Sequence, residues 1–256
     1  MDIEKIKVND RYIACSISSV EGKPAIVFIH GAGSTREVWE AQWIYFKDKT
    51  KVVIPDLPGH GDSDGKGCNS ISDYADIIVD LVKGLKIEKC ILTGHSMGGA
   101  IAQNIALRYA ELLSRLILVA TGARLRVTPQ VFKAIETDYK NYISLASSFS
   151  MSASTDEQIK SRFQSILTHS SPQSAYDDFL ACDRFDEMNR IDNIRTKTLI
   201  IVGDNDMMTP PKYAAFLHQK ISGSELVNIK DAGHMVMMEK PHEVNTAIER
   251  FISTIL

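Results

Sequence analysis

A five-residue motif, Gly94-His95-Ser96-Met97-Gly98, constrains the fold of this chain more than any other feature. An apolar run over 89–93 precedes it, and small and apolar residues at helical spacing follow it over 97–109. A sharp turn from a strand into a helix holds the central serine in a strained backbone conformation, with its hydroxyl exposed at the helix N-terminus. The motif therefore predicts that Ser96 is a nucleophile.

A serine hydroxyl needs a base that takes its proton and an acid that orients the base. In chains with such a turn, both follow the serine in sequence. The candidates for the base are His169, His218, His234 and His242. Only His234 follows both a strand-like run, 225–229, and a turn that ends in a glycine, Gly233. We therefore expect His234 to be the base.

The acid is expected after the preceding strand, for which the β-branched run 198–203 is the candidate. Asp204 and Asp206 follow this run. Asp206 lies one step further out and four residues before Pro210, which is expected in the first turn of the next helix. We favour Asp206 as the acid, with Asp204 as a turn or capping residue.

An oxyanion hole requires two backbone N–H groups directed at the developing negative charge. Met97, directly after the serine, supplies one, and the loop after an early central strand supplies the other. The run 25–29 leads into His30-Gly31-Ala32-Gly33, so we expect the Ala32 N–H to be the second donor. His30 is expected to hold this loop by hydrogen bonds.

The chain alternates strand-like and helix-like runs, which predicts an α/β fold with a mainly parallel twisted sheet and helices on both faces. The runs 3–8 and 11–18 predict an antiparallel N-terminal hairpin. Further strands are expected near 25–29, 51–55, 89–93, 115–120, 197–202 and 224–229, and helices near 36–47, 70–85, 97–109, 211–220 and 240–255.

The alternation stops between 122 and about 190, where apolar residues recur at helical spacing. This predicts three or four helices inserted after the sixth strand as a cap over the serine. The expected division is a core over 1–121 and 191–256, interrupted by a helical cap over 122–190.

Candidate pocket residues lie next to the expected catalytic positions. They are Trp39, Met207, Met208 and Met235. Methionine fills irregular apolar space and adapts to different ligands. A core position for Trp39 is the alternative. Arg124 and Arg126, at the start of the cap, are either surface charges or ligands for a carboxylate or the phosphates of an acyl carrier.

The motifs together resemble the α/β-hydrolase superfamily, specifically its compact single-domain carboxylesterases and thioesterases. The resemblance rests on 30–33, 56–63, 94–99, 203–206 with 209–210, and 232–234. It implies cleavage of a small-molecule carboxylic ester or thioester through an acyl-enzyme. Members with aspartate at the elbow form an alkyl-enzyme ester, and Ser96 departs from that pattern. C–C bond hydrolysis, acyl transfer and binding of a small ligand without catalysis stay open as alternatives.

Composition is that of one globular domain, with 44% hydrophobic and 24% charged residues and a net charge of −3. A slightly negative net charge argues against a nucleic-acid partner. The sequence contains no run of about 18 apolar residues, so we expect no membrane span. The cysteines, Cys15, Cys68, Cys90 and Cys182, have no metal-binding spacing. We expect no metal or cofactor, free thiols and a cytoplasmic protein, and the sequence indicates no particular oligomeric state.

Overall fold

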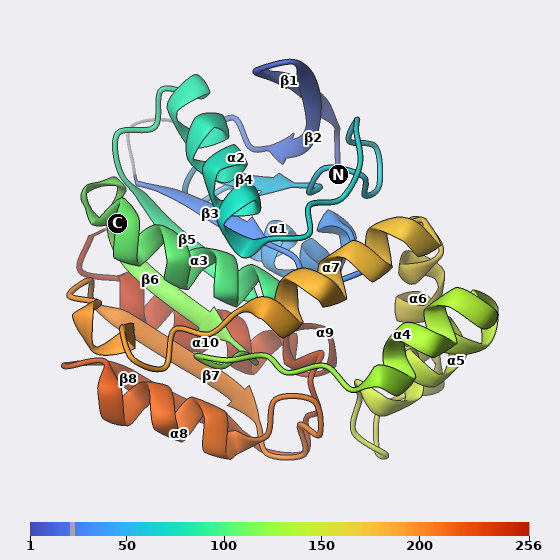
Figure 1. Cartoon of the computed structure of the whole chain (residues 1–256). Helices are drawn as coiled ribbons and strands as arrows, with labels where there is room; N and C mark the ends of the chain where they lie inside the picture. The colour runs from blue at the N-terminus through green and yellow to red at the C-terminus, as the bar shows by residue number, and fades with distance from the viewer. Residues whose placement is uncertain (21–23, 256) are drawn as a thin grey trace.

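An eight-stranded sheet with the order β1-β2-β4-β3-β5-β6-β7-β8 forms the centre of the computed structural model, which describes residues 1–20 and 24–255 (Figure 1). The strands are β1 (Glu4–Val8), β2 (Arg11–Ile17), β3 (Ala25–Ile29), β4 (Val52–Pro55), β5 (Cys90–His95), β6 (Leu113–Val119), β7 (Thr198–Gly203) and β8 (Glu225–Ile229). From β4 to β8 all neighbours are parallel, whereas β1 with β2 and β2 with β4 are antiparallel. The predicted fold class is confirmed.

Successive side chains of the central strands pack into two cores, one on each face of the sheet. Val27 and Ile29 belong to the first core, and Ile26 and Phe28 to the second. All four are fully buried, because helices cover both faces. This explains why β3 is uniformly apolar instead of alternating with polar residues.

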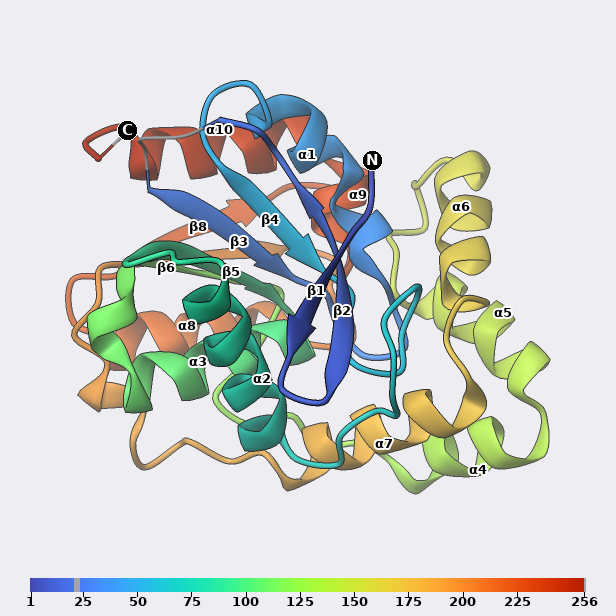
Figure 2. The ribbon, with the colours of Figure 1, turned by 90° about the horizontal axis from the view of Figure 1, so that it is seen from above.

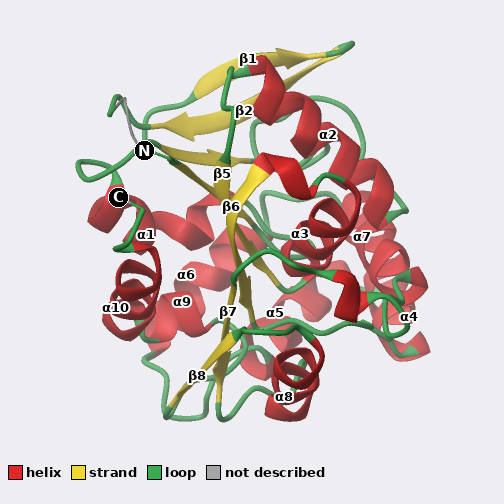
Figure 3. Ribbon diagram, turned by 90° about the vertical axis from the view of Figure 1, so that its left-hand side faces the viewer, coloured by secondary structure: helices red, strands yellow, loops and turns green. Residues whose placement is uncertain are grey.

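The first core contains α2 (Ile71–Gly84), α3 (Met97–Arg108) and α8 (Pro211–Lys220), which cover one face of the sheet (Figure 3). On the other face lie α1 (Glu40–Phe46) and α10 (Pro241–Ile252). The helix expected over 36–47 is divided: Arg36–Trp39 forms a 3₁₀ turn before α1 begins. Short elements complete the core, namely the 3₁₀ turns η2 (Ala110–Leu112) and η3 (Ile191–Asn193) and the helix α9 (Val236–Glu239).

Four helices lie between β6 and β7 in sequence: α4 (Pro129–Thr137), α5 (Tyr139–Phe149), α6 (Glu157–Leu167) and α7 (Pro172–Arg184). Side chains of Asp138, Asp156 and Ser171 cap the N-termini of α5, α6 and α7 by accepting backbone N–H groups. The helices gather beyond the carboxyl ends of the parallel strands (Figure 2). We refer to 122–190 as the helical insertion, and its division from the core at these boundaries stays a prediction.

Within the described residues, no helix has the length and apolar character needed to cross a membrane.

Candidate active site

Ser96 lies at the sharp turn between β5 and α3, with a φ of 52°. Its backbone N–H donates to the Val119 carbonyl at 3.0 Å, and its carbonyl accepts from the Thr121 hydroxyl at 2.8 Å. A Cβ atom at Gly98 would lie 2.4 Å from the carbonyl oxygen of Ile29, so only glycine fits there. Close packing of the elbow against β3 thus holds the serine in its left-handed conformation.

His234 and Asp206 form a buried hydrogen-bonded pair at the carboxyl end of the sheet. The Nδ1 atom of His234 lies 2.9 Å from Oδ2 of Asp206, and both side chains are almost completely inaccessible to solvent. Because a carboxylate only accepts, Nδ1 carries the proton and Nε2 is the basic nitrogen of the neutral ring. The sequence prediction selected these two residues from separate loops, and the structure brings them together.

Thr209 completes the surroundings of Asp206. One carboxylate oxygen accepts the backbone N–H groups of Met208 and Thr209, and the other accepts the Thr209 hydroxyl at 2.8 Å. Burial by itself raises the pKa of Asp206. The positive charge that His234 carries when protonated, its hydrogen bond and the donors of Thr209 outweigh burial and lower the pKa below its ordinary value. Asp206 is therefore an anion that cannot rotate away from the imidazole.

His95, directly before the serine, supports His234 from the other side. Its Nε2 donates to the carbonyl oxygen of His234 at 3.0 Å, and the two rings lie 4.7 Å apart. Burial, followed by the positive charge that His234 carries when protonated, lowers the pKa of His95 to about 3, so the ring is neutral. Sequence reasoning missed this role because it sought histidines only after Ser96.

The loop after β3 packs directly onto the elbow. A Cβ atom at Gly31 would lie 2.8 Å from Nδ1 of His95 and 3.2 Å from Cβ of Ser96. His30 accepts the Leu57 N–H at Nε2 and donates from Nδ1 to the Gly31 carbonyl, at 2.9 and 2.8 Å. Burial, followed by the charge of His60, lowers the pKa of His30 to about 3, which agrees with an acceptor nitrogen. The expected loop-holding contacts of His30 are present.

The Ala32 and Met97 N–H groups lie on the two segments that meet at the serine. In the described part of the chain, the Ala32 N–H donates no hydrogen bond, and the Met97 N–H begins α3, where the helix offers it no acceptor. Positive electrostatic potential at this helix N-terminus favours a negative charge. Both groups are thus available to an oxyanion.

A small cavity of about 40 Å³ is lined by residues of both the core and the helical insertion. Its lining includes Ser96 and His234, together with Ala32, Met208 and Met235 from the core. The insertion contributes Tyr142, Ala146, Ser150, Phe163, Leu167 and Phe179. Since a cavity of about 150 Å³ holds a benzene ring, this space accommodates only a small group.

A larger apolar groove of about 470 Å³ adjoins the cavity. Tyr142, Ala146, Phe179 and Met208 line both spaces, so the groove continues from the serine towards solvent. Among the exposed large hydrophobic side chains of the described residues, Leu145, Phe149, Met207 and Met208 all line it. Apolar side chains gathered in one exposed groove mark a ligand-binding surface.

Comparison with known proteins agrees with this geometry. Residues 26–247 match the alpha/beta hydrolase family. The chain belongs to this family. A pimeloyl-[acyl-carrier protein] methyl ester esterase from Neisseria meningitidis is 26% identical over 245 residues, covering 90% of this chain and 77% of that protein.

Solved structures of other proteins are also similar to this chain. A thermophilic esterase is 35% identical, with a TM-score of 0.85, and the match covers 99% of this chain and 98% of the other. The enol-lactonase of Burkholderia xenovorans, at 22% identity and a TM-score of 0.91, covers 98% of this chain and 100% of the other and shares the fold.

One of the four candidate pocket residues of this alpha/beta hydrolase needs correction. Trp39 is fully buried against Phe28, at 5.0 Å between ring centroids, and lies outside the lining of both spaces because α1 packs it into the core. Met207 is 64% exposed and lines the outer groove but not the cavity. Met208 and Met235 line the cavity as expected.

Arg124 and Arg126 share one partner at the root of the insertion. Both pair with Asp186, at 3.7 and 3.5 Å, and Arg126 also donates to the Asp183 carbonyl. Neither lines the cavity or the groove. The pairs favour the surface-charge alternative, because the carboxylate already neutralises part of the positive charge.

Glu239 is a further residue that the sequence did not single out. Its carboxylate accepts the Gly233 N–H at 2.9 Å, next to His234, and the Ser152 N–H of the insertion at 2.8 Å. It therefore ties the histidine loop to the segment between α5 and α6. A glutamate within an apolar run was the only available signal.

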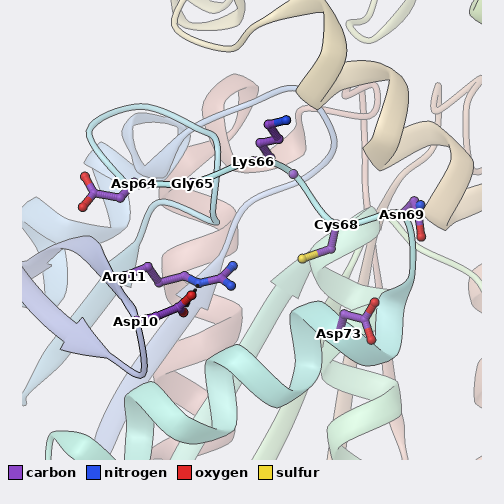
Figure 4. A pocket seen from close by; sticks show the side chains of 9 residues that line it. Asp10, Arg11, Asp64, Gly65, Lys66, Cys68, Asn69 and Asp73 are labelled. Carbon is purple, nitrogen blue, oxygen red and sulfur yellow. Dashed lines mark hydrogen bonds and ion pairs between the residues drawn. The ribbon is translucent and has the colours of Figure 1, made fainter.

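A polar hollow of about 520 Å³ lies apart from the site, between the β1–β2 turn, the loop 64–69 and the start of α2 (Figure 4). Cys68 is its only thiol, and burial raises the pKa of that thiol to about 11. No histidine is among its lining residues in the described chain, so the thiol lacks a base. Nor do the described residues contain a group of three or more metal-ligating side chains.

Proposed function

We propose that this hydrolase cleaves carboxylic esters of small to medium apolar groups through an acyl-enzyme on Ser96. The 2.9 Å hydrogen bond between His234 and Asp206, next to a cavity that both His234 and Ser96 line, carries this proposal. A strained nucleophile, a base and an anion that orients the base are the parts that serine acyl transfer requires.

In the proposed first step, the Ser96 oxygen attacks the ester carbonyl carbon, and Nε2 of His234 takes the hydroxyl proton. Asp206 stabilises the resulting imidazolium. The N–H groups of Ala32 and Met97 donate to the oxyanion, a contribution for which loss of one donor typically costs about 10²–10³ in kcat. Collapse breaks the ester C–O bond, and His234 returns the proton to the departing alcohol.

Water then attacks the acyl-enzyme, with His234 again accepting a proton. The second tetrahedral intermediate collapses to release the carboxylic acid and the Ser96 hydroxyl. No step in this sequence calls for a metal or an organic cofactor, because the proton and the negative charge are both handled by the residues named.

The two spaces at the site support a substrate with one small and one extended apolar part. The cavity of about 40 Å³ suits a short group next to the reacting carbonyl, and the groove of about 470 Å³ suits a longer chain or a ring. We propose that α4–α7 act as the cap that forms both. Each buried methylene contributes about 0.8 kcal/mol until the groove is filled, so medium chains are favoured over long ones.

Esters are favoured over coenzyme A thioesters within this proposal. Phosphate groups are best held by cations at the groove, whereas Arg124 and Arg126 lie outside its lining and both pair with Asp186. C–C bond hydrolysis and acyl transfer use the same residues and differ in the substrate supplied. Binding of a ligand without catalysis would not require a base oriented by an acid, as the Asp206–His234 pair provides.

A fluorophosphonate probe combined with a p-nitrophenyl ester series tests the proposal. We expect the probe to label Ser96 and the ester rate to fall by at least about 10⁴-fold in Ser96→Ala. Ser148→Ala is the control, because Ser148 is exposed on α5, lines neither the cavity nor the groove, and its hydroxyl donates only to the Ser144 carbonyl among the described residues. An unlabelled wild type, or residual activity within tenfold in Ser96→Ala, would overturn it.

A further inference from the structure

We propose that Asp178, on α7 of the helical insertion, is a positioning residue that holds the oxyanion loop in place. The inference rests on the proposed ester hydrolysis. Oδ2 of Asp178 accepts the Gly33 N–H at 2.7 Å, across 145 positions of sequence. Gly33 directly follows Ala32, whose N–H is the proposed oxyanion donor.

Asp178 is completely buried and fully hydrogen-bonded. Besides Gly33, Oδ2 lies 2.8 Å from Nε2 of His60, and Oδ1 accepts the Tyr74 hydroxyl at 2.5 Å. Each of these side chains is at most 1% exposed. The donors come from the loop after β3, the loop after β4 and helix α2, so the carboxylate joins three segments of the core to one helix of the insertion.

Hydrogen-bond geometry makes His60 a cation. Its Nδ1 faces the Pro58 carbonyl at 3.0 Å, and its Nε2 faces the Asp178 carboxylate. Neither partner has a proton to donate, so both ring nitrogens carry one. The charge on this ring balances the carboxylate, which explains how an anion persists in a fully buried position.

The contact with Gly33 bears on catalysis because Ala32 is fixed from both sides. On one side, the Gly31 carbonyl, which belongs to the same peptide unit as the Ala32 N–H, accepts from His30 at 2.8 Å. On the other side, Asp178 holds the next peptide unit through the Gly33 N–H. Gly33 has a φ of 64°, a conformation that glycine adopts without strain, and glycine has no side chain that could restrict this unit, so the contact with Asp178 limits its freedom.

Loss of the contact should therefore reduce stabilisation of the transition state more than it reduces the affinity for substrate. An oxyanion donor acts on a charge that exists only in the tetrahedral intermediate, so its misplacement lowers kcat and leaves KM nearly unchanged. A thionoester, which places sulfur where the oxyanion forms, makes poorer hydrogen bonds to such donors. The ratio of kcat/KM for an ester to that for its thionoester reports the quality of the hole.

The test compares three variants of the full chain. His60→Leu/Asp178→Leu removes the pair together, which leaves no lone buried charge and favours a folded product. Asp178→Asn keeps an oxygen that accepts the Gly33 N–H. Asp177→Leu is the matched control, since Asp177 neighbours Asp178 on α7 and its only side-chain hydrogen bond within the described residues is with Gln173. Thermal unfolding verifies that each variant is folded.

For the double variant we expect kcat to fall about tenfold to a hundredfold, KM to stay within about threefold, and the ester-to-thionoester ratio to fall at least about threefold. Asp178→Asn and Asp177→Leu should stay within about threefold of wild type in all three quantities. A folded double variant with the kcat and ratio of wild type would overturn the inference. An equal loss for ester and thionoester would also overturn it, because that outcome indicates only an anchor for α7. A wild type that cleaves no ester would overturn the proposed function instead, and this inference with it.

Discussion

The imidazole of His95 donates a hydrogen bond from Nε2 to the carbonyl oxygen of His234, at 3.0 Å. The residue before the proposed nucleophile therefore fixes the backbone of the proposed base. Since β5 and the loop after β8 are joined by this contact, the distance between the two reacting groups depends on a third side chain, which also lines the small cavity.

His95→Leu should slow ester cleavage by about tenfold to a hundredfold, because loss of one buried hydrogen bond costs about 1–3 kcal/mol. His95→Gln, which retains a donor, should recover part of the rate. Steady-state kinetics with p-nitrophenyl acetate measures both. Equal rates in His95→Leu and wild type would show that the contact is dispensable.

Asp206→Asn should lower kcat by about 10³–10⁴-fold, because the amide neither stabilises the imidazolium nor enforces the correct tautomer. Asp204→Asn, on an exposed position of the same turn, should change kcat by less than about threefold. The reverse order of the two effects would transfer the role of the acid to Asp204.

Phe149→Ala should raise KM for p-nitrophenyl hexanoate about threefold to tenfold and leave the acetate unchanged, since a partly exposed groove residue contributes about 1 kcal/mol. Ile44→Ala serves as the control, because Ile44 is similarly exposed outside the groove. An activity maximum at palmitate, with activation by an oil–water interface, would contradict the limited groove.

Stability should depend on pH through His60. Burial lowers its pKa, but the charge and hydrogen bond of Asp178 and the Pro58 carbonyl raise it above the ordinary value of 6.5. A raised folded-state pKa contributes stability below 6.5 that is lost as pH rises through the folded-state value.

The free energy of unfolding of wild type, relative to His60→Leu/Asp178→Leu, should therefore decline as the pH rises above 6.5, by at most about 1.4 kcal/mol per pH unit. Denaturant unfolding at each pH measures it. A constant difference across this range would mean that His60 is neutral in the folded protein.

Local patterns were sufficient to predict the parallel sheet and the loops that carry Ser96, Asp206 and His234, because each lies directly after an apolar strand. The helices of the insertion could also be predicted from a local pattern, namely the helical spacing of their apolar residues. Residues that act through distant contacts left no such pattern. Asp178 and Tyr74 are 104 positions apart, and only the folded chain places the hydroxyl of one on the carboxylate of the other.

Trp39 shows that a sequence pattern can also suggest a functional position where the structure has none. Its position shortly after the oxyanion loop suggested a pocket wall, yet Trp39 ends a 3₁₀ turn, Arg36–Trp39, and its indole packs against Phe28 in the second core. Proximity in sequence to a functional loop fixes neither the direction of a side chain nor the face of the sheet on which it lies.

The two ends of the helical insertion are joined at their root, where Arg124 pairs with Asp186 in an isolated β-bridge and the Glu187 N–H donates to the Ala123 carbonyl at 2.8 Å. The segment between these residues therefore leaves the core and returns to it at the same place. A graft that exchanged 125–185 for the corresponding segment of another family member would thus leave the sheet and its register intact. Such a chimera would retain the full kcat only if the incoming segment also carried an acceptor for the Gly33 N–H, so recognition and catalysis cannot be exchanged as fully independent modules.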